Sequence, residues 1–254
     1  MAPFDLTGKK AFVTGASRGI GQAIAVALAQ AGADVAVVAR GEEGLAETAG
    51  QIASYGRQAH VIPADVTRQE AVEAAVTAAI DRLGHIDVVV NNAGGSNFLV
   101  SFLDLRLPGW DKLMRLNLDS AMYVCHAVGG HLVGRGSGSV INVASVAGLI
   151  GSPFLSPYGA AKAGLISLTK SLAVEWAERG VRVNALCPGW TATDLNRNLW
   201  EDATVGPATV ATVPMRRWGR AEEMAGPAIF LASDASSYMT GQALVIDGGQ
   251  TALS

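Results

Sequence analysis

A tyrosine and a lysine four residues apart are the clearest candidates for proton transfer in this chain. Tyr158 and Lys162 lie in the stretch FLSPYGAAKAGLISLTKSLAVEWA, and residues four apart share one face of a helix. Ser156 as N-cap and Pro157 at the first helical position predict a helix that begins just before Tyr158. Both side chains would then project near the positive end of a helix. A phenol in such a place can serve as a general acid or base.

The charge of Lys162 is large enough to activate this phenol. A free phenol titrates near ~10, so ionisation close to neutral pH requires a change of about three pH units, or roughly 4 kcal/mol. An ammonium at ~4 Å with an effective dielectric constant of ~20 supplies about that much. We therefore expect Lys162 to lower the pKa of Tyr158.

Two further polar residues are candidates for the same site. Ser145, in VINVASVAG, lies at the carboxyl end of an expected strand, the edge at which open α/β sheets bind ligands. Asn117 interrupts an otherwise apolar helical surface in LMRLNLDSAM. Each of these four residues also has a structural explanation on its own, as a core aromatic, a surface cation, a turn serine or a buried amide.

The glycine-rich stretch TGASRGIG indicates a nucleotide phosphate site. Gly15, Gly19 and Gly21 follow a short apolar run and lead directly into IGQAIAVALAQAG. Glycine at these places permits a tight strand-to-helix turn and lets a pyrophosphate approach the helix N-terminus. A glycine triplet alone also occurs in structural turns, but its place after the first strand of a βαβ series favours dinucleotide binding.

The residues after the second expected strand favour NADP(H) over NAD(H). Ala39 occupies the place where NAD-binding chains usually carry an acid for the ribose 2′-hydroxyl. Arg40 follows it, and Arg18 lies in the glycine turn; planar guanidinium groups pair well with phosphate. The alternative is two solvated surface arginines. Glu42 and Glu43 fit better in the first turn of the next helix, where the dipole favours acids.

Seven short apolar runs define the elements that position these residues. They are KAFVTG, DVAVVA, AHVIPA, IDVVVNNAG, GSVINVAS, GVRVNALCPG and QALVIDGG, with Ala-rich helical stretches between them. Nearly continuous hydrophobicity in each run predicts an α/β fold, a Rossmann-type doubly wound parallel seven-stranded sheet with helices on both faces. One domain, 1–254, is expected. Residues 188–220 are irregular, and we interpret them as a substrate lid with a short helix. Pro227 should kink or delay the helix that follows.

Composition narrows the class of partner. Charged residues make up 16% of the chain and the net charge is −3 with no basic run, so nucleic acid is not an expected partner. Cys125 and Cys187 have the apolar surroundings of buried cytosolic thiols. No stretch is predicted to span a membrane or to serve as a signal peptide, so we expect a soluble cytoplasmic protein. No metal site is expected, because the four histidines are dispersed: His60, His85, His126 and His131.

Together these motifs resemble the short-chain dehydrogenase/reductases over nearly the whole chain. TGASRGIG, ADVT, NNAG, the set Asn117, Ser145, Tyr158 and Lys162, and PGWTAT occur in this order. The resemblance implies an oxidoreductase that transfers a hydride between a nicotinamide and a carbonyl or secondary alcohol, with NADP(H) as cofactor. It is greatest to 3-oxoacyl-carrier-protein reductases, to sugar-acid dehydrogenases such as gluconate 5-dehydrogenase and to secondary-metabolite ketoreductases. A non-catalytic dinucleotide-binding regulator or scaffold on the same fold is the alternative.

The resemblance also implies individual roles. Lys162 would bind the nicotinamide ribose, Ser145 the substrate oxygen, and Asn117 a water that connects Lys162 to solvent. Thr191 stands where the family more often has an aliphatic residue, which leaves the role of its side chain open. The whole set expected at the cofactor is Gly15, Ser17, Arg18, Gly19, Ile20, Gly21, Arg40, Asp65, Val66, Asn91, Ala93, Gly94, Tyr158, Lys162, Pro188, Gly189, Thr191 and Thr193.

Substrate choice is expected in GGSNFLVSFLDLRLPGW and in the segment after Pro188. Three arginines in the segment after Pro188 could bind an acidic group of the substrate, or could simply be solvated at the surface: Arg197, Arg216 and Arg217. An apolar pocket could form, with core packing as the alternative, from Phe98, Phe102, Trp190, Leu195, Leu199 and Trp200. The family is usually tetrameric, so a homotetramer is expected, with the apolar helices around 110–132 and 157–179 as candidate interfaces.

Overall fold

A seven-stranded parallel sheet forms the centre of the molecule. The computed structural model describes residues 3–96 and 99–253. The strand order is β3-β2-β1-β4-β5-β6-β9, and every pair is parallel. All seven predicted strands are confirmed: β1 (Lys10–Thr14), β2 (Asp34–Ala39), β3 (Ala59–Pro63), β4 (Val88–Asn91), β5 (Gly138–Val143), β6 (Val181–Pro188) and β9 (Ala243–Ile246).

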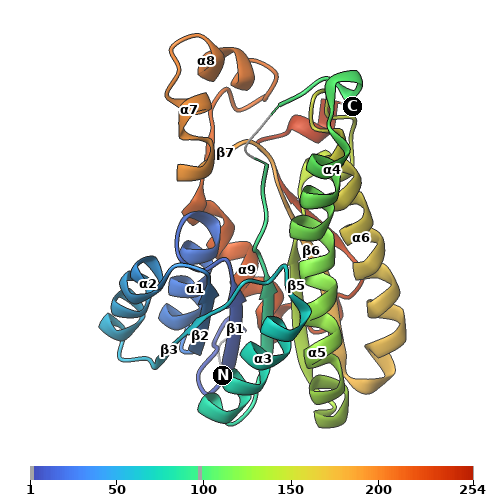
Figure 1. Ribbon diagram of the computed structural model, residues 1–254. Helices are drawn as coiled ribbons and strands as arrows, with labels where there is room; N and C mark the ends of the chain where they lie inside the picture. Colours follow the sequence, from blue (N-terminus) through green and yellow to red (C-terminus); the bar gives the residue numbers. More distant parts are fainter. Residues whose placement is uncertain (1–2, 97–98, 254) are drawn as a thin grey trace.

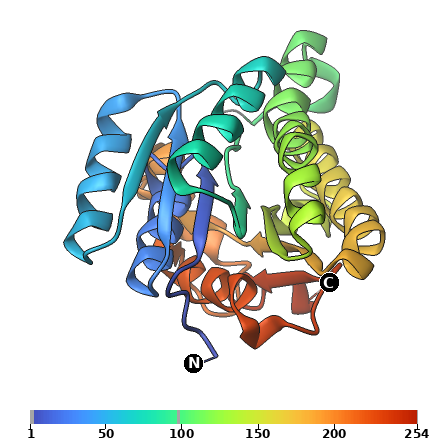
Figure 2. The same ribbon diagram turned by 90° about the horizontal axis from the view of Figure 1, so that it is seen from below.

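Helices cover both faces of this sheet, as the apolar strands require. On one face lie α1 (Gly19–Gln30), α2 (Glu42–Ser54) and α9 (Ala225–Ala232), and on the other α3 (Gln69–Leu83), α5 (Ser120–Arg135) and α6 (Ser156–Trp176). The view along the strands shows the three layers (Figure 2). Helix α4 (Leu107–Met114) continues into α5 through a π-helical turn, Arg115–Asp119.

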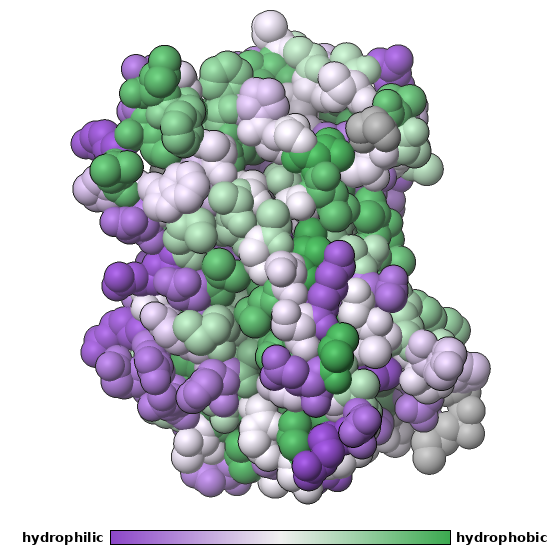
Figure 3. Space-filling model, turned by 90° about the vertical axis from the view of Figure 1, so that its right-hand side faces the viewer, coloured by the Kyte–Doolittle hydropathy of each residue, from purple (hydrophilic) through white to green (hydrophobic). Residues whose placement is uncertain are grey.

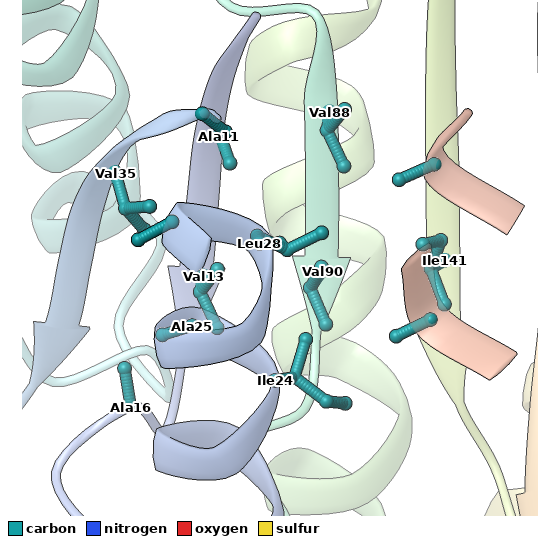
Figure 4. Packing of buried hydrophobic residues seen from close by; sticks show 14 of the residues in the cluster. Ala11, Val13, Ala16, Ile24, Ala25, Leu28, Val35, Val88, Val90 and Ile141 are labelled. Carbon is teal, nitrogen blue, oxygen red and sulfur yellow. The ribbon is translucent and has the colours of Figure 1, made fainter. Parts of the chain in front are cut away.

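Close packing of small and branched side chains holds the layers together. Ile24 and Leu28 of α1 are fully buried over β1 and β4, where they lie close to Val13 and Val90 (Figure 4). Burying a side chain of this size contributes about 1.5–3 kcal/mol. The spacing of the buried positions on α1 is that of one helical face, which fixes the helix and therefore the glycine turn that precedes it.

The strand order creates the ligand-binding edge. From β1 the chain moves outward through β2 and β3, and then returns to place β4 on the other side of β1. Such a reversal opens a crevice at the carboxyl ends of the strands. The ends at Thr14, Ala39, Asn91, Val143 and Pro188 all lie at this edge because the strands are parallel.

Residues 188–220 rise above the carboxyl edge of the sheet (Figure 1). They contain two short helices, α7 (Arg197–Trp200) and α8 (Val205–Val210), where the sequence predicts one. A small parallel pair, β7 (Thr191–Ala192) and β8 (Gly219–Arg220), closes the base of the segment. Helix α9 begins at Ala225 after a 3-10 turn, so Pro227 delays its start as predicted. The described 3-10 turns are Phe102–Asp104, Val146–Gly148, Ala177–Arg179, Asp194–Asn196, Ala221–Met224, Asp234–Ser236 and Gln250–Leu253.

Two negative findings apply to the described residues. In residues 3–96 and 99–253, no helix is both long and apolar enough to cross a membrane. The same residues contain no group of three or more metal-binding side chains that could hold an ion.

A cavity of about 580 Å³ lies at the amino-terminal edge of the sheet, opposite the carboxyl ends of the strands. None of the predicted site residues lines it.

Candidate active site

The glycine turn has the geometry of an anion site. Gly15 and Gly19 have positive φ angles of 64° and 58°, which side chains with a Cβ rarely adopt. A Cβ at Gly21 would lie 2.2 Å from the carbonyl oxygen of Gly15, so no other residue fits there. Arg18, the N-cap of α1, makes no capping bond with its side chain, and the first turn holds no acid. The amide hydrogens and the helix dipole are therefore available to a phosphate.

Two residues that the sequence analysis did not single out hold this turn in place. The side-chain nitrogen of Asn92 donates to the carbonyl oxygens of Thr14 and Gly15, both at 3.1 Å. The Thr14 hydroxyl accepts from the backbone nitrogens of Asn92 and Ala93, at 3.1 and 3.2 Å. The signal was present in TGASRGIG and NNAG, but a motif does not say which of its residues bind the ligand and which join two loops.

Arg40 lies just beyond β2 and is exposed, as is Arg18. Neither guanidinium has an ion pair among the described residues. Burial opposes ionisation of Asp65, but hydrogen bonds from Thr67 and the charge of Arg40 hold the pKa of that carboxyl below its usual value. Arg40 is thus close enough to influence the expected adenine end of the site, and its charge is available to a phosphate.

Asn91 faces the protein interior rather than the sheet edge. Its side chain is 4% exposed, and its nitrogen donates to Asn142 Oδ1 at 2.9 Å and to Cys125 Sγ at 3.3 Å. A cofactor contact of Asn91 would therefore come from its backbone. Ala93 and Gly94 continue from this strand end toward Asn117 and Lys162.

Tyr158 and Lys162 lie on one face of α6, as predicted. The Lys162 Nζ is 5.6 Å from the centre of the Tyr158 ring and donates to the carbonyl oxygen of Val143 at 2.8 Å. Only 3% of Lys162 is exposed. A hydrogen bond anchors this cation below the phenol, at the end of β5.

The protonation of the pair differs from the expectation. Burial raises the pKa of Tyr158, and the hydrogen bond with the Ser145 side chain only partly offsets this. Burial also lowers the pKa of Lys162 to about 8. The prediction that Lys162 brings the phenol toward neutral pH is wrong for the ligand-free chain, because the same burial that brings the two groups together removes water from both.

Ser145 begins the turn after β5 and its side chain approaches the Tyr158 hydroxyl. Its oxygen also accepts from the backbone nitrogen of Ala147 at 3.1 Å, which fixes the side chain. Cys187, at the end of β6, accepts a hydrogen bond from the Ser145 backbone and interacts electrostatically with Lys162. Burial raises the pKa of Cys187 to about 11, so this thiol is neutral below that pH. Both cysteines are free and buried, as predicted.

Asn117 lies in the π-helical turn between α4 and α5. The wider turn is typical of functional sites, and it aims the amide at the loop after β4. Asn117 Oδ1 accepts from the Gly95 nitrogen at 2.7 Å, and Nδ2 donates to the carbonyl oxygens of Gly95 and Leu113, both at 3.0 Å. A Cβ at Gly94 would meet Asn117 Oδ1 at 2.7 Å and Lys162 Nζ at 3.2 Å, so these two side chains converge on Gly94.

The start of α6 differs from the prediction by one residue. Leu155 is the N-cap, since its carbonyl oxygen accepts from the Gly159 nitrogen at 2.8 Å. Ser156 is the first helical residue, and its buried hydroxyl has no hydrogen-bond partner among the described residues. Phe154, with a φ of 65°, turns the chain sharply just before the N-cap Leu155. Pro157 fits the second helical position equally well because its nitrogen needs no partner in the first turn.

The segment after β6 reaches over the glycine turn. A Cβ at Gly19 would lie 3.5 Å from Thr193 Cβ. Thr191 is 7% exposed, and its hydroxyl donates to the carbonyl oxygen of Gly189 at 3.2 Å. The side chain of Thr191 thus stabilises its own loop, which answers the question that its unusual type raised. Asn196 ties the loop further, because its Oδ1 accepts from the Thr193 nitrogen at 2.9 Å.

Comparison with known proteins agrees with this geometry. Residues 15–251 match the family model described as enoyl-(acyl carrier protein) reductase. Gluconate 5-dehydrogenase of Gluconobacter oxydans (strain 621H) is 38% identical, with 98% of this chain and 96% of the relative covered. 3-Oxoacyl-[acyl-carrier-protein] reductase of Synechocystis sp. is 40% identical, with 96% and 97% covered.

The crystal structure of a gluconate 5-dehydrogenase from Burkholderia cenocepacia J2315, in complex with NADP and tartrate, superposes with a TM-score of 0.93. It is 39% identical, with 98% of each chain covered. The chain belongs to the short-chain dehydrogenase/reductases. Within this oxidoreductase family, the relatives carry different names while sharing one fold, so the family alone does not fix the substrate.

Among the side chains expected to select the substrate of this dehydrogenase/reductase, two tryptophans are held in place by contacts within residues 188–220, and two other side chains are exposed to solvent. Trp190 packs edge-on against Trp218, with ring centres 5.4 Å apart, and Trp200 Nε1 donates to the carbonyl oxygen of Thr193 at 3.0 Å, so both are held by the segment itself. Leu195 and Phe102 are exposed by 41% and 67%. Phe98 lies outside the described residues.

Proposed function

We propose that this protein is an NADP(H)-dependent reductase or dehydrogenase that interconverts a ketone and a secondary alcohol, with Tyr158 as the general acid or base. The observation that carries the proposal is the convergence of Ser145, Tyr158 and Lys162 at the sheet edge that also holds the glycine turn. Oxidoreductase family membership agrees with it.

The residues at the sheet edge fit a dinucleotide with a 2′-phosphate. The cradle at Gly15, Gly19 and Gly21 excludes a Cβ at its closest point, and the α1 N-terminus offers amide hydrogens to the pyrophosphate. Arg40 and Arg18 carry the charge that a 2′-phosphate needs, with Ala39 in place of a competing acid. NADPH, when bound, supplies the hydride.

The raised pKa of Tyr158 suits the reducing direction. The phenol remains protonated at neutral pH, so it can give its proton to the oxygen of a carbonyl as that carbon receives the hydride. The charge of Lys162 then stabilises the phenolate that remains. A cation held beneath the ring by the Val143 carbonyl oxygen needs no rearrangement at that moment.

Ser145 and Asn117 complete the proposed machinery. The Ser145 hydroxyl is fixed next to Tyr158 and can hydrogen-bond the same substrate oxygen. Asn117 and Lys162 both approach Gly94, and Asn117 would hold the water that returns protons from solvent to Lys162. Residues 188–220 would act as the lid, with Thr193 beside Gly19 of the glycine turn.

A Tyr158→Phe variant, assayed with a panel of ketones and with both NADPH and NADH, tests the proposal. General acid catalysis contributes about 10²–10⁴-fold, so turnover should fall by that amount while NADPH binding, measured by fluorescence, stays within twofold. Retention of most wild-type turnover would rule out this mechanism. Tight NADPH binding by the wild type without turnover of any ketone or alcohol would instead favour a regulatory or scaffold protein.

One face of the molecule has the apolar surface that the subunit contacts of a homotetramer would need. Between α5 and α6 lies a groove of about 370 Å³, lined chiefly by apolar side chains that include Met122, Leu168, Leu172 and Trp176. Figure 3 views this side of the molecule and shows apolar side chains spread along it. Sedimentation as a monomer at micromolar concentration would remove this part of the proposal. A cytoplasmic location is proposed from the two buried free thiols.

A further inference from the structure

The arginines of residues 188–220 are engaged within the protein. Arg197 contacts the Asp194 carboxylate and lies 3.9 Å from Glu201. Arg217 forms a two-pronged pair with Glu223, at 2.7 and 2.8 Å. This pairing holds the pKa of Glu223 at about 2, so the carboxylate stays charged at any working pH.

The remaining charges of the segment do not favour an anion either. Arg216 donates to the carbonyl oxygen of Ala211, and the charge of Arg220 acts on Glu223. Residues 188–220 contain four arginines and three carboxylates, and Glu222 and Glu223 follow directly after them. An anionic substrate would meet no net attraction from the segment together with these two acids, and would have to break an existing pair to gain a cation from Arg197 or Arg217.

The loops next to the catalytic residues contain no charge. Residues 92–103 and 145–161 include no Asp, Glu, Lys or Arg. The two loops are joined, because the Val100 nitrogen donates to the Phe154 carbonyl oxygen at 3.0 Å. Among the described residues of these loops the exposed side chains are apolar, including Leu99, Leu149 and Phe154 with 51%, 43% and 59% exposure. Phe154 keeps a left-handed backbone only four residues before Tyr158, a cost that other contacts must offset.

Leu195 brings an apolar side chain from residues 188–220 close to the catalytic groups. A Cβ at Gly95 would lie 2.3 Å from Leu195 Cδ2, so Leu195 packs directly on Gly95. Gly95 is held by both side-chain atoms of Asn117, and Gly94 beside it lies against Lys162 Nζ. Leu195 is therefore one glycine away from the catalytic set, yet still 41% exposed and free to contact a ligand.

We propose that the substrate is an uncharged ketone or alcohol with an apolar flank, and that Leu195 is a specificity-determining residue for it. This inference rests on the proposed function of the same site. Burying a carboxylate without a paired cation is costly, whereas apolar groups gain from contact with Leu195 and the loops around it.

Two substrates that share one ketone, but end in an apolar ester or in a charged carboxylate, provide the test. Ethyl 4-oxopentanoate and 4-oxopentanoate present the same ketone, one with an ester and the other with a carboxylate. With NADPH we expect kcat/KM for the ester to exceed that for the acid by at least about tenfold, the factor that corresponds to roughly 1.4 kcal/mol. Equal or better reduction of the acid would overturn the inference while leaving the proposed function intact. Reduction of neither these nor any other ketone would count against the proposed function itself.

Variants at Leu195 test the specificity role. Leu195→Ala should lower kcat/KM for propiophenone by about tenfold, as expected for lost apolar contacts, and should change that for acetone, which has no flank to bury, by less than twofold. Val205→Ala is the matched control, because Val205 lies in the same segment with the same 41% exposure and should leave both values unchanged. Equal losses for the two ketones, or an equal loss in the control, would overturn the role of Leu195.

Discussion

Replacing the buried lysine should stabilise the protein while it inactivates the enzyme. The pKa of Lys162 falls from 10.5 to about 8 because burial disfavours the charged form. At about 1.4 kcal/mol per pH unit, the folded chain pays roughly 3 kcal/mol to keep this cation at pH 7. Methionine has a similar volume and carries no charge.

The net gain in a Lys162→Met variant is smaller than this cost. The carbonyl oxygen of Val143 loses its donor, and an unsatisfied buried acceptor costs about 1–3 kcal/mol. With the middle of that range, roughly 1 kcal/mol remains, which should raise the Tm of the ligand-free protein by about 2–4 °C at pH 7. Turnover should fall by about 10²-fold or more, since the phenolate loses its stabilising charge.

The pH dependence of the same variant follows from the sign of the pKa change. Below pH 8 Lys162 is charged in both the folded and the unfolded chain, so the full cost is present. Between pH 8 and 10.5 the folded chain releases the proton while the unfolded chain keeps it, so stability rises with pH. The difference in Tm between the variant and the wild type should therefore shrink between pH 7 and pH 9.5, because the wild type becomes more stable.

Thermal unfolding at these two pH values, followed by circular dichroism, measures the effect. Lys170→Met is the control, since Lys170 is exposed on the same helix and its replacement should leave Tm within about 1 °C. A natively folded Lys162→Met protein that melts at or below the wild-type Tm at pH 7 would refute the reasoning.

Three further predictions concern other parts of the molecule. Arg40→Glu should reverse the preference of the wild type for NADPH over NADH, measured as the ratio of kcat/KM, and an unchanged ratio would exclude Arg40 as the 2′-phosphate ligand. Gly21→Ala places a Cβ 2.2 Å from the Gly15 carbonyl oxygen and should cost about 1–3 kcal/mol in urea unfolding, together with most NADPH affinity; wild-type values for both would contradict the cradle geometry. Burial and the charge of Arg135 lower the pKa of His131, whose Nε2 accepts a hydrogen bond from the Ile86 nitrogen. The free energy of unfolding should therefore fall as the pH drops below about 6.5, because the unfolded chain gains the proton first. If a His131→Asn variant loses as much stability as the wild type between pH 7.5 and 5.5, other groups are responsible.

The sequence determined the fold and most of the placement of the candidate site. Runs of Val and Ile separated by helical stretches predicted seven parallel strands, and all seven are present. Once the strands are parallel, their carboxyl ends must share one edge. That is why Gly15, Ser145 and Pro188, which are far apart in the chain, could be assigned to one site from local patterns alone.

The tertiary structure decided the hydration of the site residues, and with it their pKa values, and also which charges are paired. Spacing placed Tyr158 beside Lys162, but only packing determines how much water remains around them, and its removal raises the pKa of one and lowers that of the other. The arginines of the 188–220 segment looked available in the sequence. Arg197 has acidic partners three residues before it and four residues after it. Arg217 pairs with Glu223, six residues later, a spacing that no helical period reveals.

The contact of Leu195 with Gly95 was beyond sequence reasoning for the same reason. The two residues are a hundred positions apart, and an irregular segment of two short helices brings them together. Secondary structure follows from local residue types and their period, so the sequence carries it. Solvation, ion pairing and long-range contacts depend on which surfaces meet, and this is settled only when the chain has folded.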